Sequence, residues 1–422
     1  MKTKIIHVTQ SSARGLAYGI GTYLENSMSC LRDHYDFEIV DFNATIPFPC
    51  IRYSNGYKRI LIPCPFSNTS EKHLKNYLRN VAFALRTFFL TDNSFYIFHF
   101  HIFHFEILAE WLKKLFNCKI IATIHYSDWN YHLLENNNRY NSIVDKKSES
   151  LSDNSECSVW DLMESNKKIS QYFDHFICPA NHTVHSLRDI LLVAPSKMTV
   201  INHGIKDEYA DYKKDIKKIW KKNFFLSSKT QIIVFVGRLD KIKGVNFLIS
   251  AFEKVLIEKT NVHLFIAGEG NFEELISPAK NICSKVSFTG KLSKEELRDL
   301  YNMADIGVVC SFYEEFGYVA LEMIMHGIPI IVTETTGLDE MIQDNITGLK
   351  VPIIMENDKR VVDVDTLSQK ILLLLRDYNL RKKLSKNGRQ HYLEKYNLSI
   401  FKEKMIDFYN MMSDELDKEN SP

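Results

Sequence analysis

Short apolar runs alternate with helical patterns along the chain. The first half holds six strand-like runs, at residues 4–10, 37–42, 95–101, 118–125, 175–180 and 198–204. Apolar residues recur at helical spacing over 22–34, 70–90 and 106–116. The second half repeats the alternation, with strands predicted at 231–237, 263–268, 286–290, 305–310, 328–333 and 347–352, and helices near 244–258, 317–326 and from 365 to about 415. This alternation predicts an α/β fold with parallel sheets.

A charged stretch separates the two series. Residues 206–228 carry no strand signal and include the basic, helix-like run YKKDIKKIWKKNF. We therefore expect two Rossmann-like domains, over 1–205 and 229–385, joined by a linker at 206–228. Helices over 386–422 are expected to pack back on the first domain. In such folds a ligand binds at the carboxyl ends of the strands, so the crevice between the two domains is the expected site.

Composition narrows the class of protein. The chain has 422 residues, of which 45% are hydrophobic and 25% charged, with a net charge of +1. This is typical of a globular protein with large cores, whereas nucleic-acid binders usually show a basic excess, so no nucleic-acid partner is expected. The 8 cysteines contain no C-x-x-C pair, which predicts reduced and mostly buried thiols. No signal-peptide pattern and no long apolar run is found, which predicts a cytoplasmic location.

Two carboxylates lie eight residues apart in the stretch SFYEEFGYVALEMIMHGIPII, at 311–331. Glu314 falls in a short loop after a predicted strand, and Glu322 about two turns into the following helix. The helix begins near Phe316–Gly317, where free amide groups and the positive end of the helix dipole suit a phosphate. Carboxylates at these places can accept hydrogen bonds from the hydroxyl groups of a sugar and a ribose.

Two basic residues lie after the first strand of the second series, in IIVFVGRLDKIKGVNFLISAF at 232–252. Arg238 and Lys243 fall between this strand and the next helix. A bidentate arginine and a lysine there would stabilise the growing negative charge of a departing diphosphate. An exposed basic loop would explain either residue taken alone.

These stretches together resemble the E-x7-E region of bacterial family-4 retaining glycosyltransferases, which have the GT-B fold. The specific part of the resemblance covers roughly 231–352 and includes GKLSKEELRDLYNMADIGVVCS and TGLDEMIQDNITGLKVP. The resemblance implies that Arg238 and Lys243 hold the donor diphosphate without a divalent cation. It further implies that Glu314 holds the donor sugar, Glu322 the ribose, and the amides of Phe316–Gly317 the diphosphate.

The resemblance also assigns roles in the first half. Gly19 and Gly21 precede a predicted helix at the place of the family's glycine loop, which faces the diphosphate; a simple turn is the alternative. His125 ends the strand at 118–125, where family members carry a histidine that contacts the donor sugar; the alternative is a core histidine. The polar, Asn- and Ser-rich loop at 135–157 is where we expect acceptor preference to be set.

Three histidines lie in the apolar stretch FYIFHFHIFHFEI at 95–107. On a strand, His99 and His101 point to one face, while His104 lies past the strand's end. Zinc needs three or four convergent ligands and no clear fourth is nearby, so no metal or cofactor is expected. The plain interpretation is a buried strand with histidines at the crevice edge. Acceptor contact by His101 is the alternative.

Two further features have a structural and a functional interpretation. Residues 72–90 form an amphipathic helix with basic residues on one face, which fits a helix packed on its own sheet and equally a helix at the inner face of an anionic membrane. In VDVDTLSQK, Asp363 and Asp365 mimic a D-x-D metal motif, but Asp365 is expected to be the N-cap of the next helix.

The implied activity is a retaining, metal-independent hexosyl transfer from a nucleotide-sugar to an acceptor hydroxyl, in cell-envelope polysaccharide or glycolipid synthesis. The acceptor would be a carbohydrate, a lipid-linked sugar or a peptide. Two departures from the family leave alternatives open. Glu315 stands in place of the usual Gly, and Asn202–His203–Gly204 in place of P-N-G. A phosphorylase on the same scaffold, or a non-catalytic nucleotide-sugar-binding subunit, are the rival hypotheses.

Overall fold

The computed structural model describes most of the chain: residues 3–10, 19–43, 46–54, 56–63, 70–89, 95–101, 106–126, 160–161, 164–168, 170–209, 215–271, 275, 279–357 and 359–419. The described residues divide into two α/β units. Unit 1 runs through residue 126, resumes over 160–204 and ends with 398–419, and unit 2 takes 205–397. The chain returns from unit 2 to unit 1 at residue 398, whereas the sequence had predicted that the second domain ends at 385. The predicted positions of His104 and of the 135–157 loop lie outside the described residues.

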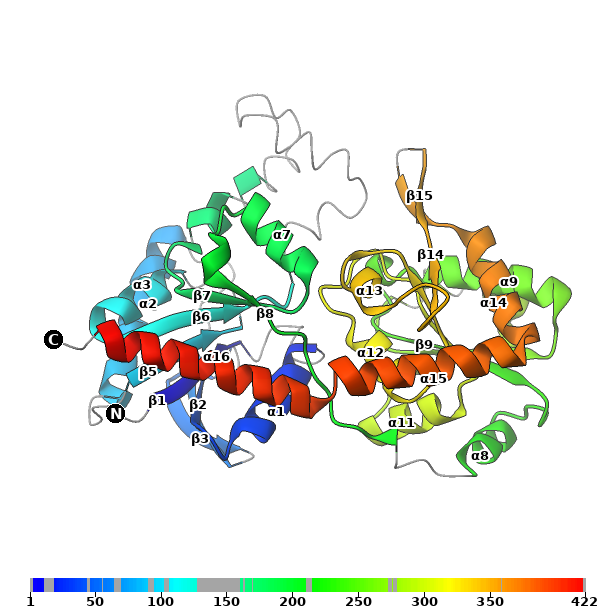
Figure 1. Ribbon diagram of the computed structural model, residues 1–422, viewed down its shortest axis with the longest axis horizontal. Helices are drawn as coiled ribbons and strands as arrows, with labels where there is room; N and C mark the ends of the chain where they lie inside the picture. The colour runs from blue at the N-terminus through cyan, green and yellow to red at the C-terminus, as the bar shows by residue number, and fades with distance from the viewer. Residues whose placement is uncertain are drawn as a thin grey trace. The chain divides into compact units, whose positions relative to one another are not determined.

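Unit 1 is built on an eight-stranded sheet in the order β3-β4-β2-β1-β5-β6-β7-β8 (Figure 1). All neighbouring strands are parallel except the β3–β4 pair. The strands are β1 Thr3–Thr9, β2 Asp36–Asn43, β3 Cys50–Ser54, β4 Tyr57–Pro63, β5 Phe95–Phe100, β6 Cys118–Thr123, β7 His175–Cys178 and β8 Met198–Val200. The helices are α1 Gly19–Leu31, α2 Glu71–Phe89, α3 Glu106–Leu115, α7 Asn181–Asp189, η3 Pro195–Lys197 and α16 Leu398–Glu419.

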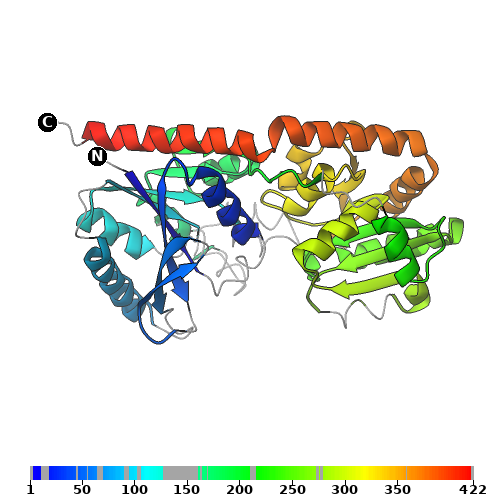
Figure 2. The same ribbon diagram turned by 90° about the horizontal axis from the view of Figure 1, so that it is seen from below.

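The helices of unit 1 cover both faces of its sheet. Helices α2 and α3 pack against each other on one face, and α1 packs beside the long α16 on the other (Figure 2). The C-terminal helix α16 lies against β5 and β6, so the end of the chain completes the core of the first unit. The apolar face of α2 packs inside unit 1, since Leu78, Val81 and Leu85 are buried.

Unit 2 is built on a six-stranded parallel sheet in the order β11-β10-β9-β12-β13-β14. Its strands are β9 Gln231–Val236, β10 Val262–Ala267, β11 Val286–Gly290, β12 Ile306–Val309, β13 Ile330–Thr333 and β14 Leu349–Val351, with a separate hairpin of β15 Ile353–Glu356 and β16 Lys359–Val362. Its helices are α8 Ile216–Asn223, η5 Lys241–Lys243, α9 Val245–Glu258, η6 Lys280–Lys285, α11 Lys294–Met303, α12 Tyr318–Met325, α13 Thr336–Met341, α14 Val364–Arg376 and α15 Tyr378–Lys395.

The two faces of this sheet bury alternate residues of each strand. On β9, Ile233 and Phe235 join the core formed with α9 and α14, whereas Ile232 and Val234 join the core formed with α11, α12 and α15. Both faces of a parallel sheet are buried, so its strands read as continuous apolar runs, which is why they were predictable. The fold confirms the predicted α/β class.

The hairpins β3–β4 and β15–β16, and the packing of the basic stretch inside unit 2, are features of the structure that the sequence pattern did not predict. The edge strand β3 is almost wholly exposed and carries no apolar run. Its partner β4 holds only the short buried run Ile60–Ile62, which was not predicted as a strand. The basic stretch expected as a linker contains α8, which packs inside unit 2: Trp220 stacks on Phe224, and Phe224 meets Phe265 of β10 edge-on at 4.8 Å.

Candidate functional site

The carboxyl ends of the unit 2 strands bring the predicted motifs together. The strand order changes direction between β9 and β12, and the loops that follow these two strands diverge to either side. In doubly wound sheets this switch point is where a ligand is bound. The loop after β9 carries Arg238 and Lys243, and the loop after β12 carries Glu314.

Lys243 and Glu314 meet across the switch point. The Lys243 ammonium lies 2.5 Å from Glu314 Oε1, and Ser311 Oγ donates to the same oxygen at 2.8 Å. Both charged side chains are largely buried, with 17% and 16% of their surface exposed. Arg238 takes another partner, Asp240, at 3.1 Å. The predicted phosphate-binding cations are therefore each paired with a carboxylate.

A close approach of two loops fixes the position of Lys243. Gly244 follows it with φ of 64°, and a Cβ there would lie 2.2 Å from the carbonyl oxygen of Cys310. The Cys310 thiol donates to the carbonyls of Lys243 and Gly244, both at 3.3 Å. Only glycine fits this left-handed, crowded position, so K-G after the first strand is a geometric requirement of the site.

The loop with Glu314 is held from its other side by the loop after β13. Thr335 Oγ1 donates to the Phe312 carbonyl at 2.7 Å, and Thr336 Oγ1 donates to the Glu314 carbonyl at 2.7 Å. The Gly337 amide donates to the same Glu314 carbonyl at 2.9 Å. Sequence reasoning missed these supports. In the sequence, these residues belong to the run TETTG, which begins at the end of the strand predicted at 328–333.

Glu315, which departs from the family pattern, is buried. Its carboxylate accepts a hydrogen bond from the Tyr313 hydroxyl, and 6% of the residue is exposed. This partner differs from those of the Glu314 carboxylate, which bonds Lys243 and Ser311. Phe316 is also buried, and Gly317 is the N-cap of α12 in the left-handed region with φ of 98°.

Glu322 lies in the second turn of α12 and faces α11. The Tyr301 hydroxyl donates to its Oε2 at 2.6 Å. Burial disfavours the charged carboxylate and raises the pKa of Glu322 to about 7, although the hydrogen bond from Tyr301 acts in the opposite direction. Glu322 is thus a buried carboxyl group that holds its proton more tightly than an exposed glutamate does.

In unit 1, the predicted glycines belong to the helix. Gly19 and Gly21 lie in the first turn of α1, which begins at Gly19 and not after the glycines as expected. Residues 11–18 of the predicted glycine loop lie outside the described residues. The diphosphate role of the two glycines stays a prediction.

A histidine cluster stands at the carboxyl edge of the unit 1 sheet. His7 of β1 is paired in register with His99 of β5. His101 Nε2 lies 2.8 Å from His7 Nδ1, and His101 Nδ1 lies 2.9 Å from His125 Nε2. His203 packs against His125 with the ring centroids 5.7 Å apart. The sequence had placed His99, His101 and His125 at this edge. His7 was not singled out, and His203 was noted only within the departure Asn202–His203–Gly204.

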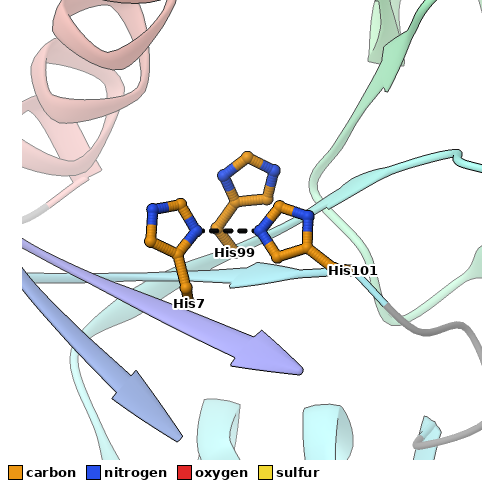
Figure 3. Close-up of side chains that lie close together, drawn as sticks. All are labelled: His7, His99 and His101. Atoms are coloured by element: carbon orange, nitrogen blue, oxygen red, sulfur yellow. Dashed lines mark hydrogen bonds between the residues drawn. The ribbon is translucent and has the colours of Figure 1, made fainter. Parts of the chain in front are cut away.

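His7, His99 and His101 lie close enough together for a metal site to be considered. One ring nitrogen from each of His7, His99 and His101 lies within 4.8 Å of the others (Figure 3). However, His99 bonds Tyr409 and Thr123, both at 2.7 Å, and His101 bonds its neighbours through both nitrogens. Of the three rings, only His7 Nε2 lacks a partner among the described residues. A metal would have to break this network. The buried His101 also offers no free nitrogen to an acceptor, and that role stays a prediction.

Other features have local explanations. The N-cap of α14 is Asp363, whose carboxylate accepts a hydrogen bond from the Thr366 amide at 2.9 Å. The prediction that Asp365 is the N-cap was therefore wrong. Asp365 pairs with Lys254 instead. Ser293 and Glu296 form a capping box at the start of α11. Thiol burial holds for Cys178 and Cys310 but not for other described cysteines, such as the exposed Cys283.

Residues 216–391 match the family model of the glycosyl transferases group 1. This range holds all the predicted site residues of unit 2. An uncharacterized glycosyltransferase of Methanocaldococcus jannaschii, MJ1607, is 31% identical over 227 residues, which cover 51% of this chain and 54% of the relative. The chain spans about half the length of the curated relatives it matches.

Solved structures match nearly the whole chain. Sucrose-phosphate synthase from Thermosynechococcus elongatus has a TM-score of 0.74 at 19% identity, covering 98% of this chain and 100% of that one. Anabaena HepE in complex with UDP-glucose has a TM-score of 0.70 at 13% identity, covering 97% and 99%. The fold is therefore GT-B, as predicted. No helix among the described residues is long and apolar enough to cross a membrane.

Proposed function

We propose that this chain is a glycosyltransferase that moves a sugar from a nucleoside-diphosphate sugar to an acceptor hydroxyl, with retention at the anomeric carbon. The observation that carries the proposal is the Lys243–Glu314 pair at the switch point of the unit 2 sheet, inside the range that matches the group 1 family. The fold it shares with a protein crystallised with UDP-glucose supports a nucleotide-sugar as donor.

The ion pairs of Lys243 and Arg238 suggest how the donor would be bound. The diphosphate would replace Glu314 as the partner of Lys243 and Asp240 as the partner of Arg238. Glu314, released from Lys243 but still bonded by Ser311, would then accept hydrogen bonds from the sugar hydroxyls. The amides at the start of α12, after Gly317, would bind the remaining phosphate oxygens. Glu322 would accept a hydrogen bond from the ribose.

The reaction would need no group beyond the substrates. The acceptor oxygen forms a bond to the anomeric carbon while the bond from that carbon to the β-phosphate oxygen breaks. The departing phosphate oxygen takes the proton of the acceptor hydroxyl, so the products are the glycoside and the nucleoside diphosphate. Lys243 and Arg238 would stabilise the charge that grows on the leaving group, which is why we propose metal-independent transfer.

For the acceptor, we name only a chemical class. We propose a carbohydrate hydroxyl of an envelope polysaccharide or glycolipid. The apolar stripe of α2 packs within unit 1, but Lys72, Lys75 and Arg86 are exposed on its outer face. Membrane contact through 72–90 would therefore depend on charge, and it would weaken as salt screens that charge.

The first experiment is a thermal-shift series with UDP, GDP, ADP and CMP, each with and without EDTA. A nucleotide present at ~100 times its Kd should stabilise the folded chain by about 2.7 kcal/mol. We expect one diphosphate to raise the melting temperature, equally with EDTA, and Lys243→Ala to lose that shift. Lys241→Ala, an exposed lysine two residues away, should keep it.

Transfer is then measured with the nucleotide-sugar of the matching base. Release of the nucleoside diphosphate together with a glycoside of unchanged anomeric configuration is the expected result. Sugar release that requires inorganic phosphate and no nucleotide would overturn the proposal in favour of a phosphorylase. Nucleotide binding without transfer or hydrolysis of any donor tested would instead indicate a non-catalytic binding subunit.

A further inference from the structure

The histidines of unit 1 form a chain that ends at His125. His7 and His101 are buried, with 0% and 2% of their surface exposed. The chain runs from His7 Nδ1 to His101 Nε2 at 2.8 Å, and from His101 Nδ1 to His125 Nε2 at 2.9 Å. Figure 3 shows the facing nitrogens of the first pair, with the His99 ring beside them. His125 follows β6 and is only partly enclosed.

The rings of this chain are neutral at physiological pH. Burial lowers the pKa of His7 and His125 to about 3 and that of His101 well below its usual range. A neutral imidazole carries one N–H, so one nitrogen donates and the other accepts. Two rings that share a hydrogen bond must therefore have complementary tautomers. In a chain of three, the tautomer of one ring determines the other two.

Only two arrangements satisfy both hydrogen bonds. In the first, His7 donates through Nδ1, His101 donates through Nδ1 to His125 Nε2, and His125 keeps its proton on Nδ1. In the second, every proton sits on Nε2. The arrangements differ at the buried end, because His7 Nε2 has no partner among the described residues. The first leaves a lone pair there, whereas the second leaves an N–H, and an orphaned buried N–H is the rarer of the two.

We propose that His101, supported by His7, is a positioning residue that holds His125 in the Nδ1–H tautomer, with that N–H presented at the carboxyl edge of the unit 1 sheet. Tyr23 packs edge-on against His125 at 4.9 Å and limits the rotation of its ring. The functional part rests on the proposed glycosyl transfer: His125 would act as a hydrogen-bond donor to an oxygen of the donor sugar.

The tautomers can be read directly in the full-length protein labelled with ¹⁵N-histidine. Two-bond proton–nitrogen correlation spectra distinguish a protonated from an unprotonated ring nitrogen, and the loss of one spin system in His125→Asn assigns that residue. We expect protonated Nδ1 and bare Nε2 for His125, His101 and His7. A protonated Nε2 on His125 overturns the proposal. So does displacement of these signals on addition of Zn²⁺, because zinc would take the lone pairs that the chain needs.

The variant His101→Phe keeps a ring in the core but removes the donor to His125 Nε2. We expect the two ¹⁵N shifts of His125 to move toward each other, as both tautomers become populated. The control is His175→Phe: His175 is buried in β7 of the same sheet, bonds Thr199 at 2.8 Å and lies outside the chain. It should leave the His125 spectrum unchanged. A single Nδ1–H tautomer that persists in His101→Phe removes His101 from the positioning role.

Kinetics separate this proposal from the proposed function. With a working donor, His101→Phe should lower kcat ~10-fold and change KM less than ~3-fold, since a second-layer partner of a functional histidine typically matters by that factor. His175→Phe should change neither. If no donor is turned over but the tautomers are as expected, the proposed function fails and the positioning stands. If transfer proceeds while His125 carries its proton on Nε2, the reverse holds.

Discussion

The two units have the same architecture but opposite polar chemistry at corresponding places. At the carboxyl edge of the unit 1 sheet, the chain gathers neutral rings: His7, His101 and His125 bond one another directly. At the same edge of the unit 2 sheet it gathers full charges, with Lys243 against Glu314. Parallel sheets supply the convergence in both units, while the residue types decide what the edge can do.

The difference shows how each cluster is compatible with burial. A buried charge must be paired, and the Lys243–Glu314 pair satisfies that requirement until a diphosphate replaces one partner. A buried histidine instead loses its proton, so the unit 1 cluster needs only complementary hydrogen bonds. The unit 2 edge is therefore suited to attract a polyanion, and the unit 1 edge to present a hydrogen bond of defined direction without net charge.

Low pH should destabilise unit 1 more than unit 2, and this is the largest difference that we expect between them. Burial lowers the pKa of His7 and His125 to about 3, and in unit 1 those of His99, His101 and His203 fall well below 6.5. The unfolded chain binds these protons near pH ~6.5, so the free energy of unfolding drops as the pH falls from there toward ~3. In unit 2, His263 and His391 are the described histidines with lowered pKa values.

We therefore expect unit 1 to lose structure at a higher pH than unit 2. Hydrogen exchange of peptides from β1 and β5, compared with β9 and β12 at pH ~7, ~5.5 and ~4.5 and corrected for intrinsic rates, measures this directly. Earlier loss of protection in β9 and β12 would contradict the assignment of acid sensitivity to the histidine cluster.

Gly244→Ala should disrupt the unit 2 edge. The added Cβ would lie 2.2 Å from the Cys310 carbonyl oxygen, so the two loops that place Lys243 and Glu314 must separate. We expect a loss of about 3 kcal/mol in the free energy of unfolding, from left-handed strain and overpacking together. Denaturant unfolding measures it.

Gly290→Ala is the matched control for this substitution. Gly290 also lies in the left-handed region, with φ of 70°, but a Cβ there meets nothing within 4 Å. It should cost about 1–2 kcal/mol, from backbone strain alone. Equal losses in the two variants would mean that the contact with Cys310 contributes nothing.

Lys243→Ala tests whether the charge in unit 2 serves the reaction. We expect turnover to fall ~10²-fold or more, because the lost cation would stabilise the leaving diphosphate chiefly in the transition state. Steady-state kinetics with the donor found by thermal shift measure the change. Lys241→Ala should remain within ~2-fold of the parent, as usual for an exposed surface side chain that is not the ion-pair partner of Glu314. Unchanged turnover in Lys243→Ala would remove it from the donor site.

Glu322→Gln should have the smallest effect. The folded pKa of about 7 lies above the ordinary value of 4.5, so the folded chain binds this proton more tightly than the unfolded one. Its contribution to stability is greatest below pH ~4.5 and is lost as the pH rises through ~7. The amide cannot ionise, so at pH ~8 we expect the variant to be about 1 kcal/mol more stable, by urea unfolding. Glu356→Gln, at an exposed position, should show no such gain. A variant less stable than the parent at pH ~8 would contradict the raised pKa.

The sequence pattern determined the α/β class and most helices and core strands, because a strand buried on both faces must be a continuous apolar run. The GT-B fold was implied by the family resemblance of the motifs. The sequence also placed Arg238, Lys243 and Glu314 in loops that follow strands, and Glu322 in the helix after Glu314, since the motif spacing sets those positions. The exposed strand β3 left no such trace, and α1 began at Gly19 because helix ends depend on contacts that local pattern does not report.

Only the tertiary structure decided which side chains meet. Lys243 and Glu314 are 71 residues apart, and His7 and His101 are 94 apart, so each contact depends on strand order and loop path. The burial of Glu315 beside Tyr313, the threonine supports of Glu314 and the raised pKa of Glu322 have the same origin. A residue's ionisation and hydrogen-bond partners are set by what surrounds it in space, and neighbours along the chain specify little of that surrounding.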